Sequence, residues 1–341
     1  MKIQRFLQIA FLLSAPFFLS TPALAEPCRG VVFSTFNQAD YNKLVDMKVN
    51  LVRYDIIWDD SNLADASDAA SYSAWLAEEL DFFDIQLAKL KALNIAVNIV
   101  LHTPPGGFAS RTGQVTHRIF TESWAQQELI SSWQEIATRY LGETGIHSYD
   151  IANEPAQFSA TVPAGLKDWN GLAKDVVQAI RAIDPTKPIV VSSLFGDPRK
   201  FKTLDLLPYD NILYSFHFYH PFKYTHQGLG KKWNKKYYPT PQLNKKKLAK
   251  VMAPAYKFQK DHGVDLFVGE FAVARWAPGG DRYLRDVINL MEDNNTCWTY
   301  NSFGIVDVWS FEYTKKKNDL NKSPTPTKRE KLLRTYFNRN D

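Results

Sequence analysis

Two glutamates stand at the ends of apolar runs in this sequence. Glu154 follows the run at residues 147–152, and Glu270 follows the run at 264–269. Because an ionised carboxylate is costly to bury without a partner, two such positions indicate a function rather than packing. Cleavage of a glycosidic bond needs two carboxylates that face each other across a sugar. One of them is protonated and donates to the leaving oxygen, and the other is ionised and attacks.

Other chemically useful side chains stand at the ends of further apolar runs. We expect Arg53 to keep Glu270 ionised and His217 to hold Glu154 in position through a hydrogen bond. The sequence has no His-x-x-x-His helix, carboxylate cluster or Gly-x-Ser-x-Gly elbow, so we expect no metal, no cofactor and no serine hydrolase chemistry. The full set of candidate supporting residues is Arg53, His102, Asn153, His217, Tyr219 and Trp309.

Strand-like and helix-like segments alternate along the chain, which predicts a parallel sheet with helical crossovers. Eight such strands favour a single (β/α)₈ barrel, whose reactive groups lie at the C-terminal ends of its strands. An open doubly wound sheet is the alternative, but it would need a Gly-rich loop after the first strand, and the sequence has none. The expected strands are 31–35, 49–54, 95–101, 147–152, 189–193, 212–217, 264–269 and 304–310, and the expected helices are 75–93, 122–141, 166–183, 245–262, 281–292 and 327–337.

Residues 1–25 have the features of a secretory signal peptide. Lys2 and Arg5 precede an apolar run at 6–19, and Ala23-Leu24-Ala25 is a small-residue cleavage site. A membrane anchor is the alternative, but the run is short for a span of roughly 20 residues. We therefore expect residues 26–341 to be one catalytic domain that is secreted to the periplasm or the exterior. We expect it to be a monomer with no stable membrane insertion after cleavage.

Composition adds two constraints. Aromatic residues make up 14% of the chain, and flat rings stack on sugars, so Trp58, Trp233 and Trp276 in loops after strands are candidate outer subsites. The net charge is +5 with local lysine clusters, but no nucleic-acid-binding module accompanies them, and we expect no nucleic-acid partner. These lysines are interpreted as a solvated face, with loose attraction to anionic polymers as the alternative.

The motifs Asn153-Glu154-Pro155 and Gly269-Glu270-Phe271 resemble the signatures of glycoside hydrolase family 5. That family consists of retaining (β/α)₈ enzymes and includes many cellulases. The resemblance spans nearly all of the chain after residue 25, and it implies that Glu154 is the acid/base and Glu270 the nucleophile. It further implies that Asn153 binds the sugar 2-hydroxyl and that Tyr219 hydrogen-bonds the nucleophile. Trp309 would form the floor of the subsite that binds the sugar at the cleaved bond. The peptide bond from Trp309 to Ser310 would be cis.

The preferred hypothesis is therefore a retaining endo-β-1,4-glucanase that acts on a polysaccharide or oligosaccharide. The resemblance leaves open a mannanase, an exo-β-1,3-glucanase, a xyloglucanase or a glycolipid-cleaving enzyme on the same site. Two alternatives of another class are a secreted carbohydrate-binding barrel without turnover and a basic surface-adhesion protein.

The chain contains a single pair of cysteines, Cys28 and Cys297. Cys28 precedes the first expected strand and Cys297 precedes the last, and these strands become neighbours when a barrel closes. Because an exported protein favours disulfides, we predict a Cys28–Cys297 bridge across the closing seam.

Overall fold

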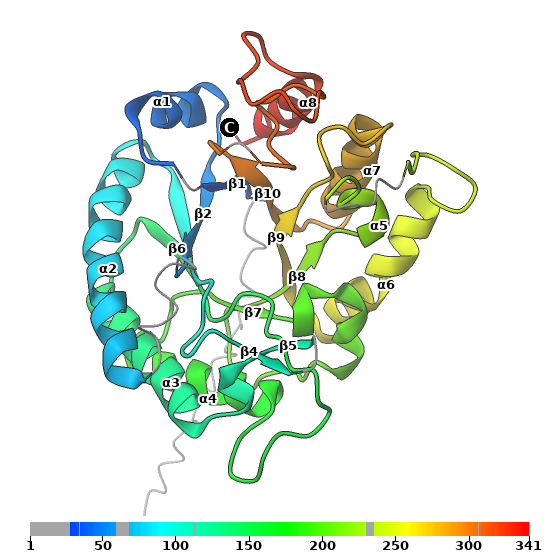
Figure 1. Ribbon diagram of the computed structural model, residues 1–341. Helices are drawn as coiled ribbons and strands as arrows, with labels where there is room; N and C mark the ends of the chain where they lie inside the picture. Colours follow the sequence, from blue (N-terminus) through cyan, green and yellow to red (C-terminus); the bar gives the residue numbers. More distant parts are fainter. Residues whose placement is uncertain are drawn as a thin grey trace, which may run out of the picture.

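Eight parallel strands form a closed barrel in the computed structural model, which describes residues 28–33, 35–58, 68–111, 114–229, 235–305 and 307–340 (Figure 1). The order around the barrel is β1-β10-β9-β8-β7-β6-β3-β2, and β1 pairs with both β2 and β10, so this sheet has no edge. The predicted single-domain (β/α)₈ barrel is confirmed. The strands are β1 (Arg29–Phe33), β2 (Leu51–Ile56), β3 (Ala96–Leu101), β6 (Ile146–Asp150), β7 (Ile189–Ser192), β8 (Ile212–Phe218), β9 (Asp265–Phe271) and β10 (Cys297–Phe303).

Helices surround the barrel and cover the outer face of the strands (Figure 1). Two 3₁₀ turns, Leu194–Gly196 and Pro198–Thr203, lie between β7 and β8 where the pattern would place a helix, and an antiparallel hairpin of β4 (Phe108–Arg111) and β5 (Gln114–His117) follows β3. Within the described ranges, no helix combines the length and the apolar character that crossing a membrane requires. The helices are α1 (Gln38–Asp46), α2 (Ala69–Ala92), α3 (Ser123–Arg139), α4 (Trp169–Arg181), α5 (Phe222–Thr225), α6 (Lys245–His262), α7 (Gly280–Glu292) and α8 (Lys328–Phe337).

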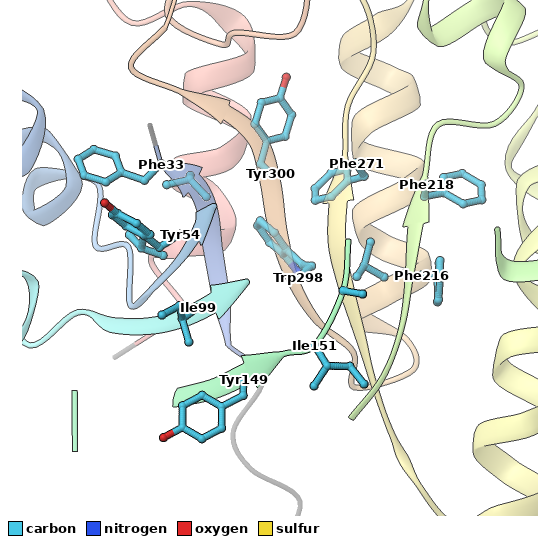
Figure 2. Close-up of a cluster of buried hydrophobic side chains, with 14 of the residues drawn as sticks. Phe33, Tyr54, Ile99, Tyr149, Ile151, Phe216, Phe218, Phe271, Trp298 and Tyr300 are labelled. Carbon is cyan, nitrogen blue, oxygen red and sulfur yellow. The ribbon is translucent and has the colours of Figure 1, made fainter. Parts of the chain in front are cut away.

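Side chains of the strands are buried almost without interruption, as expected for parallel strands that have both faces covered. Figure 2 shows part of this packing, in which Phe271 of β9 meets Trp298 and Tyr300 of β10 edge-on at centroid distances of 5.5 and 5.4 Å. Aromatic pairs of this geometry add specificity to the burial of area. The strand ends that carry the candidate residues are therefore held by a close-packed interior.

The position of the eighth strand was predicted wrongly. It spans Cys297–Phe303 rather than 304–310, because the aromatic and β-branched residues 298–300 pack between β9 and β1. Gly304 then leaves the strand at φ 91°. The cis non-proline peptide bond is Asn301–Ser302, at the end of this strand, and not Trp309–Ser310 as expected.

The predicted disulfide is present. Cys28 and Cys297 are bonded, with their Cα atoms 4.7 Å apart, and they join the N-terminal ends of β1 and β10. The bridge therefore lies across the closing seam, at the opposite end of the strands from the candidate site. The predicted signal peptide, residues 1–25, lies outside the described residues.

Candidate active site

The C-terminal ends of the strands bring the predicted carboxylates together. Glu154 and Glu270 line one cavity of about 340 Å³. One carboxylate oxygen of Glu154 lies within 4.8 Å of one of Glu270. His217, Tyr219 and Trp309 line the same cavity. Two carboxyl groups at this spacing can contact the two sides of a single glycosidic linkage.

Glu270 is held at both oxygens. Its Oε1 accepts from Arg53 Nη1 at 2.8 Å, and its Oε2 accepts from the Tyr219 hydroxyl at 2.8 Å. Burial alone would raise the pKa of Glu270, but the charges of His217 and Arg53 outweigh burial and lower that pKa to about 2. Burial and the nearby carboxylate raise the pKa of Tyr219 well above its usual 10, so the phenol keeps the proton it donates. Glu270 is therefore an ionised, oriented carboxylate.

Arg53 organises one half of the site from β2. Its Nη1 is shared between Glu270 and Asp55, at 2.8 Å each, and its Nη2 donates to Asn153 Oδ1 at 2.8 Å. Burial would lower the pKa of Arg53, but the charges of Asp55, Glu270 and Asp150 raise it above the ordinary value. Because the oxygen of Asn153 accepts from Arg53, its amide nitrogen is the atom left to donate to a ligand hydroxyl.

Glu154 occupies a different environment. Its side chain is 40% exposed, whereas that of Glu270 is 9% exposed, and its backbone has φ 40°, in the left-handed region. His217 Nδ1 lies 2.7 Å from Glu154 Oε1 and 3.8 Å from Glu270 Oε1. Burial would lower the pKa of His217, but the charges of Glu270 and Glu154 raise it. The predicted hydrogen bond between His217 and Glu154 is therefore present.

The residue before Glu270 is Gly269, and the close approach of two neighbouring side chains leaves no room there for a Cβ atom. A Cβ at this position would lie 2.8 Å from His217 Nε2 and 3.3 Å from Arg53 Nε. The absence of that atom allows His217 and Arg53 to pack close to Glu270, and their charges lower its pKa.

Trp309 reaches the cavity from the loop after β10 and not from a strand end. Its indole contacts the rings of Tyr219 and His226, with centroids 5.5 and 5.0 Å away. Its backbone N–H donates to Asp307 Oδ1 at 2.7 Å, and its carbonyl accepts from the Tyr300 hydroxyl at 2.6 Å. These backbone bonds fix the loop and hold the indole at the cavity wall.

Two groups among the described residues place metal-ligating atoms within 4.8 Å of one another. They are Asp55, His102 and Glu270, and Glu154, His217 and Glu270. Both groups depend on Glu270, whose Oε1 already accepts from Arg53. The positively charged guanidinium repels a metal cation at that carboxylate. The chemistry of these two groups therefore does not favour metal binding. His102 is half-buried and follows β3, as predicted, and one of its ring nitrogens lies within 4.8 Å of a Glu270 oxygen.

Of the candidate outer subsites, the two that the structure describes, Trp58 and Trp276, do not line this cavity. Trp58 is 4% exposed and packs against Trp75 with ring centroids 4.5 Å apart. Trp276 is half-buried and donates from Nε1 to the Gln227 carbonyl at 2.7 Å. Trp233 lies outside the described residues. Sugar stacking by these tryptophans stays a prediction.

Sequence reasoning missed several polar residues of the site, among them Asp55 and Asn301. Asp55 could have been found, because it lies two residues after Arg53 in a strand and must share its face. Asn301 donates from Nδ2 to Glu270 Oε2 at 3.1 Å, and it was missed because the last strand was placed too late in the chain.

Comparisons with known proteins identify the family of the chain. Residues 25–305 match the family model Cellulase (glycosyl hydrolase family 5). Endoglucanase C of Acetivibrio thermocellus is 26% identical over 312 residues, which cover 79% of this chain and 85% of the relative. Cellodextrinase A of Ruminococcus flavefaciens is 24% identical over 55% of this chain and 56% of its own length.

Solved structures share the fold. Cel5A of Thermotoga maritima in complex with cellobiose has a TM-score of 0.71 at 18% identity, over 91% of this chain and 98% of that one. The cellulose synthase subunit Z of Clostridioides difficile has a TM-score of 0.69 at 18% identity, over 90% of this chain and 99% of that one.

Proposed function

This chain belongs to glycosyl hydrolase family 5, and from that premise we propose that it is a retaining endo-β-1,4-glucanase with Glu270 as nucleophile and Glu154 as acid/base. It is a glycoside hydrolase, and the names of its relatives, endoglucanase and cellodextrinase, support a β-1,4-glucan as the substrate. The residue roles are supported by the geometry of the site.

The observation that carries the proposal is the spacing of the two carboxylates. One carboxylate oxygen of Glu154 lies within 4.8 Å of a carboxylate oxygen of Glu270. Inverting enzymes keep their carboxyl groups about 6.5–9.5 Å apart to admit a water molecule, whereas retaining enzymes bring them to about 5–5.5 Å. The spacing supports direct attack by one carboxylate.

The first step forms a covalent intermediate. The ionised Glu270 attacks the anomeric carbon, and the bond from that carbon to the glycosidic oxygen breaks as Glu154 gives its proton to the leaving oxygen. The charges of His217 and Arg53 lower the pKa of Glu270, which supports its ionised state at neutral pH. Asn153, whose oxygen is taken by Arg53, presents its amide N–H₂ to a sugar hydroxyl.

The second step releases the sugar. Glu154 accepts a proton from water, and the hydroxide oxygen replaces Glu270 at the anomeric carbon, so that two inversions restore the original configuration. His217, 2.7 Å from Glu154, holds the carboxylate in place while it loses and regains its proton. The peripheral position and exposure of Glu154 suit a group that exchanges protons with water.

Export forms part of the same proposal. Residues 1–25 carry a charged head, an apolar run and an Ala-x-Ala site, and a disulfide joins β1 and β10. We propose cleavage after Ala25 and secretion of a monomer to where a polysaccharide is accessible. N-terminal sequencing of the exported protein tests the cleavage site, and a mature chain that begins at Met1 would contradict it.

Hydrolysis of soluble polysaccharides tests the function. The wild type, Glu154→Ala, Glu270→Ala and the exposed-site control Glu78→Ala are compared on carboxymethyl cellulose, barley β-glucan, laminarin, galactomannan and xyloglucan. We expect the wild type and Glu78→Ala to cleave the β-1,4-linked glucans with a rapid loss of viscosity, and both site variants to lose activity. Cleavage of galactomannan or laminarin alone would contradict the proposed β-1,4-glucan substrate. Binding without turnover in all four proteins would contradict the assignment of the protein as an enzyme.

A further inference from the structure

Asn301 contacts the nucleophile position from the end of β10. Its Nδ2 lies 2.8 Å from the Tyr219 hydroxyl and 3.1 Å from Glu270 Oε2, and its side chain is half-buried. The Tyr219 hydroxyl itself lies 2.8 Å from the same Oε2. The three side chains therefore form a closed triangle beside the reacting carboxylate.

The direction of each hydrogen bond in this triangle follows from the chemistry of the groups. An ionised carboxylate only accepts, so Tyr219 and Asn301 must both donate to Glu270. Because the single phenolic proton of Tyr219 goes to Glu270, its oxygen is left to accept from the amide of Asn301. The Asn301 amide nitrogen thus lies within hydrogen-bond distance of two acceptors, the Tyr219 oxygen and Glu270 Oε2.

We propose that Asn301 is a positioning residue that fixes the orientation and the ionised state of Glu270, directly and through Tyr219. This inference rests on the proposed role of Glu270 as nucleophile. Arg53 holds Oε1, while Tyr219 and Asn301 hold Oε2, so the carboxylate cannot rotate about its terminal bond. Asn301 brings donors without a charge, so it favours the anion without the strong ion pairing that a second arginine would add.

The neighbouring residue offers a matched control. The hydroxyl of Ser302 donates to Asp307 Oδ2 at 2.5 Å, and Asp307 accepts from the backbone of Trp309. Ser302 thus stabilises the loop that carries Trp309, whereas Asn301 contacts the nucleophile. A substitution at Ser302 disturbs the same strand end without removing a donor to Glu270.

The test compares the pH dependence of kcat/KM for the wild type, Asn301→Ala, Asn301→Asp and Ser302→Ala. In Asn301→Ala, loss of the donors should raise the apparent pKa of the acid limb of kcat/KM by about 1–2 units. It should also reduce kcat about tenfold and leave KM within about twofold of the wild type. Asn301→Asp keeps the shape but places a second carboxylate beside Glu270, so its acid limb should rise further, by about 2 units or more. Ser302→Ala should change KM and keep the wild-type acid limb.

A second measurement separates this inference from the proposed function. A 2-deoxy-2-fluoro cellobioside with a dinitrophenyl leaving group traps the glycosyl-enzyme, and peptide mass analysis locates the label. Label on Glu270 in the wild type, with slower labelling of Asn301→Ala, supports both proposals. Label on Glu270 with unchanged acid limbs in both Asn301 variants would overturn the role of Asn301 alone. Label on another residue would overturn the proposed nucleophile. Circular dichroism confirms that each variant is folded, and the isosteric Asn301→Asp keeps the test valid if Asn301→Ala does not fold.

Discussion

Removal of the Cys28–Cys297 disulfide is expected to lower stability strongly and to leave the site intact. The two cysteines are 269 residues apart, so the bond closes a loop that includes almost the whole folded domain. The chain-entropy relation for a loop of this length gives about 5.6 kcal/mol at 25 °C. An unfolding entropy of about 2.1 cal/mol/K per residue over roughly 300 residues is about 0.6 kcal/mol/K, and the corresponding fall in Tm is about 9 °C.

The assay is thermal unfolding of the wild type and of Cys28→Ala/Cys297→Ala, each with and without dithiothreitol. We expect the Tm of the double variant to be about 9 °C below that of the wild type. The reductant should lower the Tm of the wild type by a similar amount and leave the Tm of the variant unchanged. Activity at 25 °C should be unchanged, because the bridge joins the N-terminal ends of β1 and β10, away from the carboxylates. A fall in Tm below about 2 °C would refute the loop-closure reasoning. A folded variant with lost activity would refute the separation of the seam from the site.

Three further predictions concern the carboxylates and the groups beneath them. Glu154→Ala should lose about 1,000-fold or more in kcat on glucans. On a dinitrophenyl cellobioside, whose leaving group needs no proton, the variant should keep much of its first-step rate, and azide should restore turnover. Equal losses on both substrates would contradict an acid/base role. Arg53→Met removes one of the two largest charges that lower the pKa of Glu270 to about 2, so that pKa rises by about 1–3 units and the ionised form is lost below about pH 3–5 instead of pH 2. An acid limb of kcat/KM that does not move would show that His217 alone keeps Glu270 ionised. Gly269→Ala places a Cβ 2.8 Å from His217 Nε2, and we expect kcat to fall about 100-fold. A variant with the kcat of the wild type would show that the close approach of His217 and Arg53 to Glu270 is not needed for activity.

The parts of the site that could be predicted from the sequence are those that lie at the ends of strands with a clear apolar pattern. His217 and Glu270 are the next-to-last residues of β8 and β9, and Arg53 lies within β2. Parallel strands of a closed barrel direct such side chains toward one rim. The disulfide followed from the closure of the barrel, because β1 and β10 become neighbours only in a closed sheet.

Other features depend on contacts that no local pattern reports. Residues 297–303 and 304–310 are both apolar enough for a strand, and the choice is made by packing against β9 and by the Asp307 carboxylate, which accepts from the backbone N–H groups of Trp309 and Ser310. Asn301 was missed for this reason. Trp58 shows the same limit, since only the packed structure reveals that Trp75 covers its ring.

The configuration of the first product tests the central claim most directly. Proton NMR during hydrolysis of a cello-oligosaccharide or barley β-glucan records the anomer that appears before mutarotation. Attack by Glu270, with Glu154 as acid and then base, predicts that the β-anomer appears first and that the α-anomer grows in more slowly. Initial release of the α-anomer would mean that water attacks directly, and it would contradict the covalent role of Glu270.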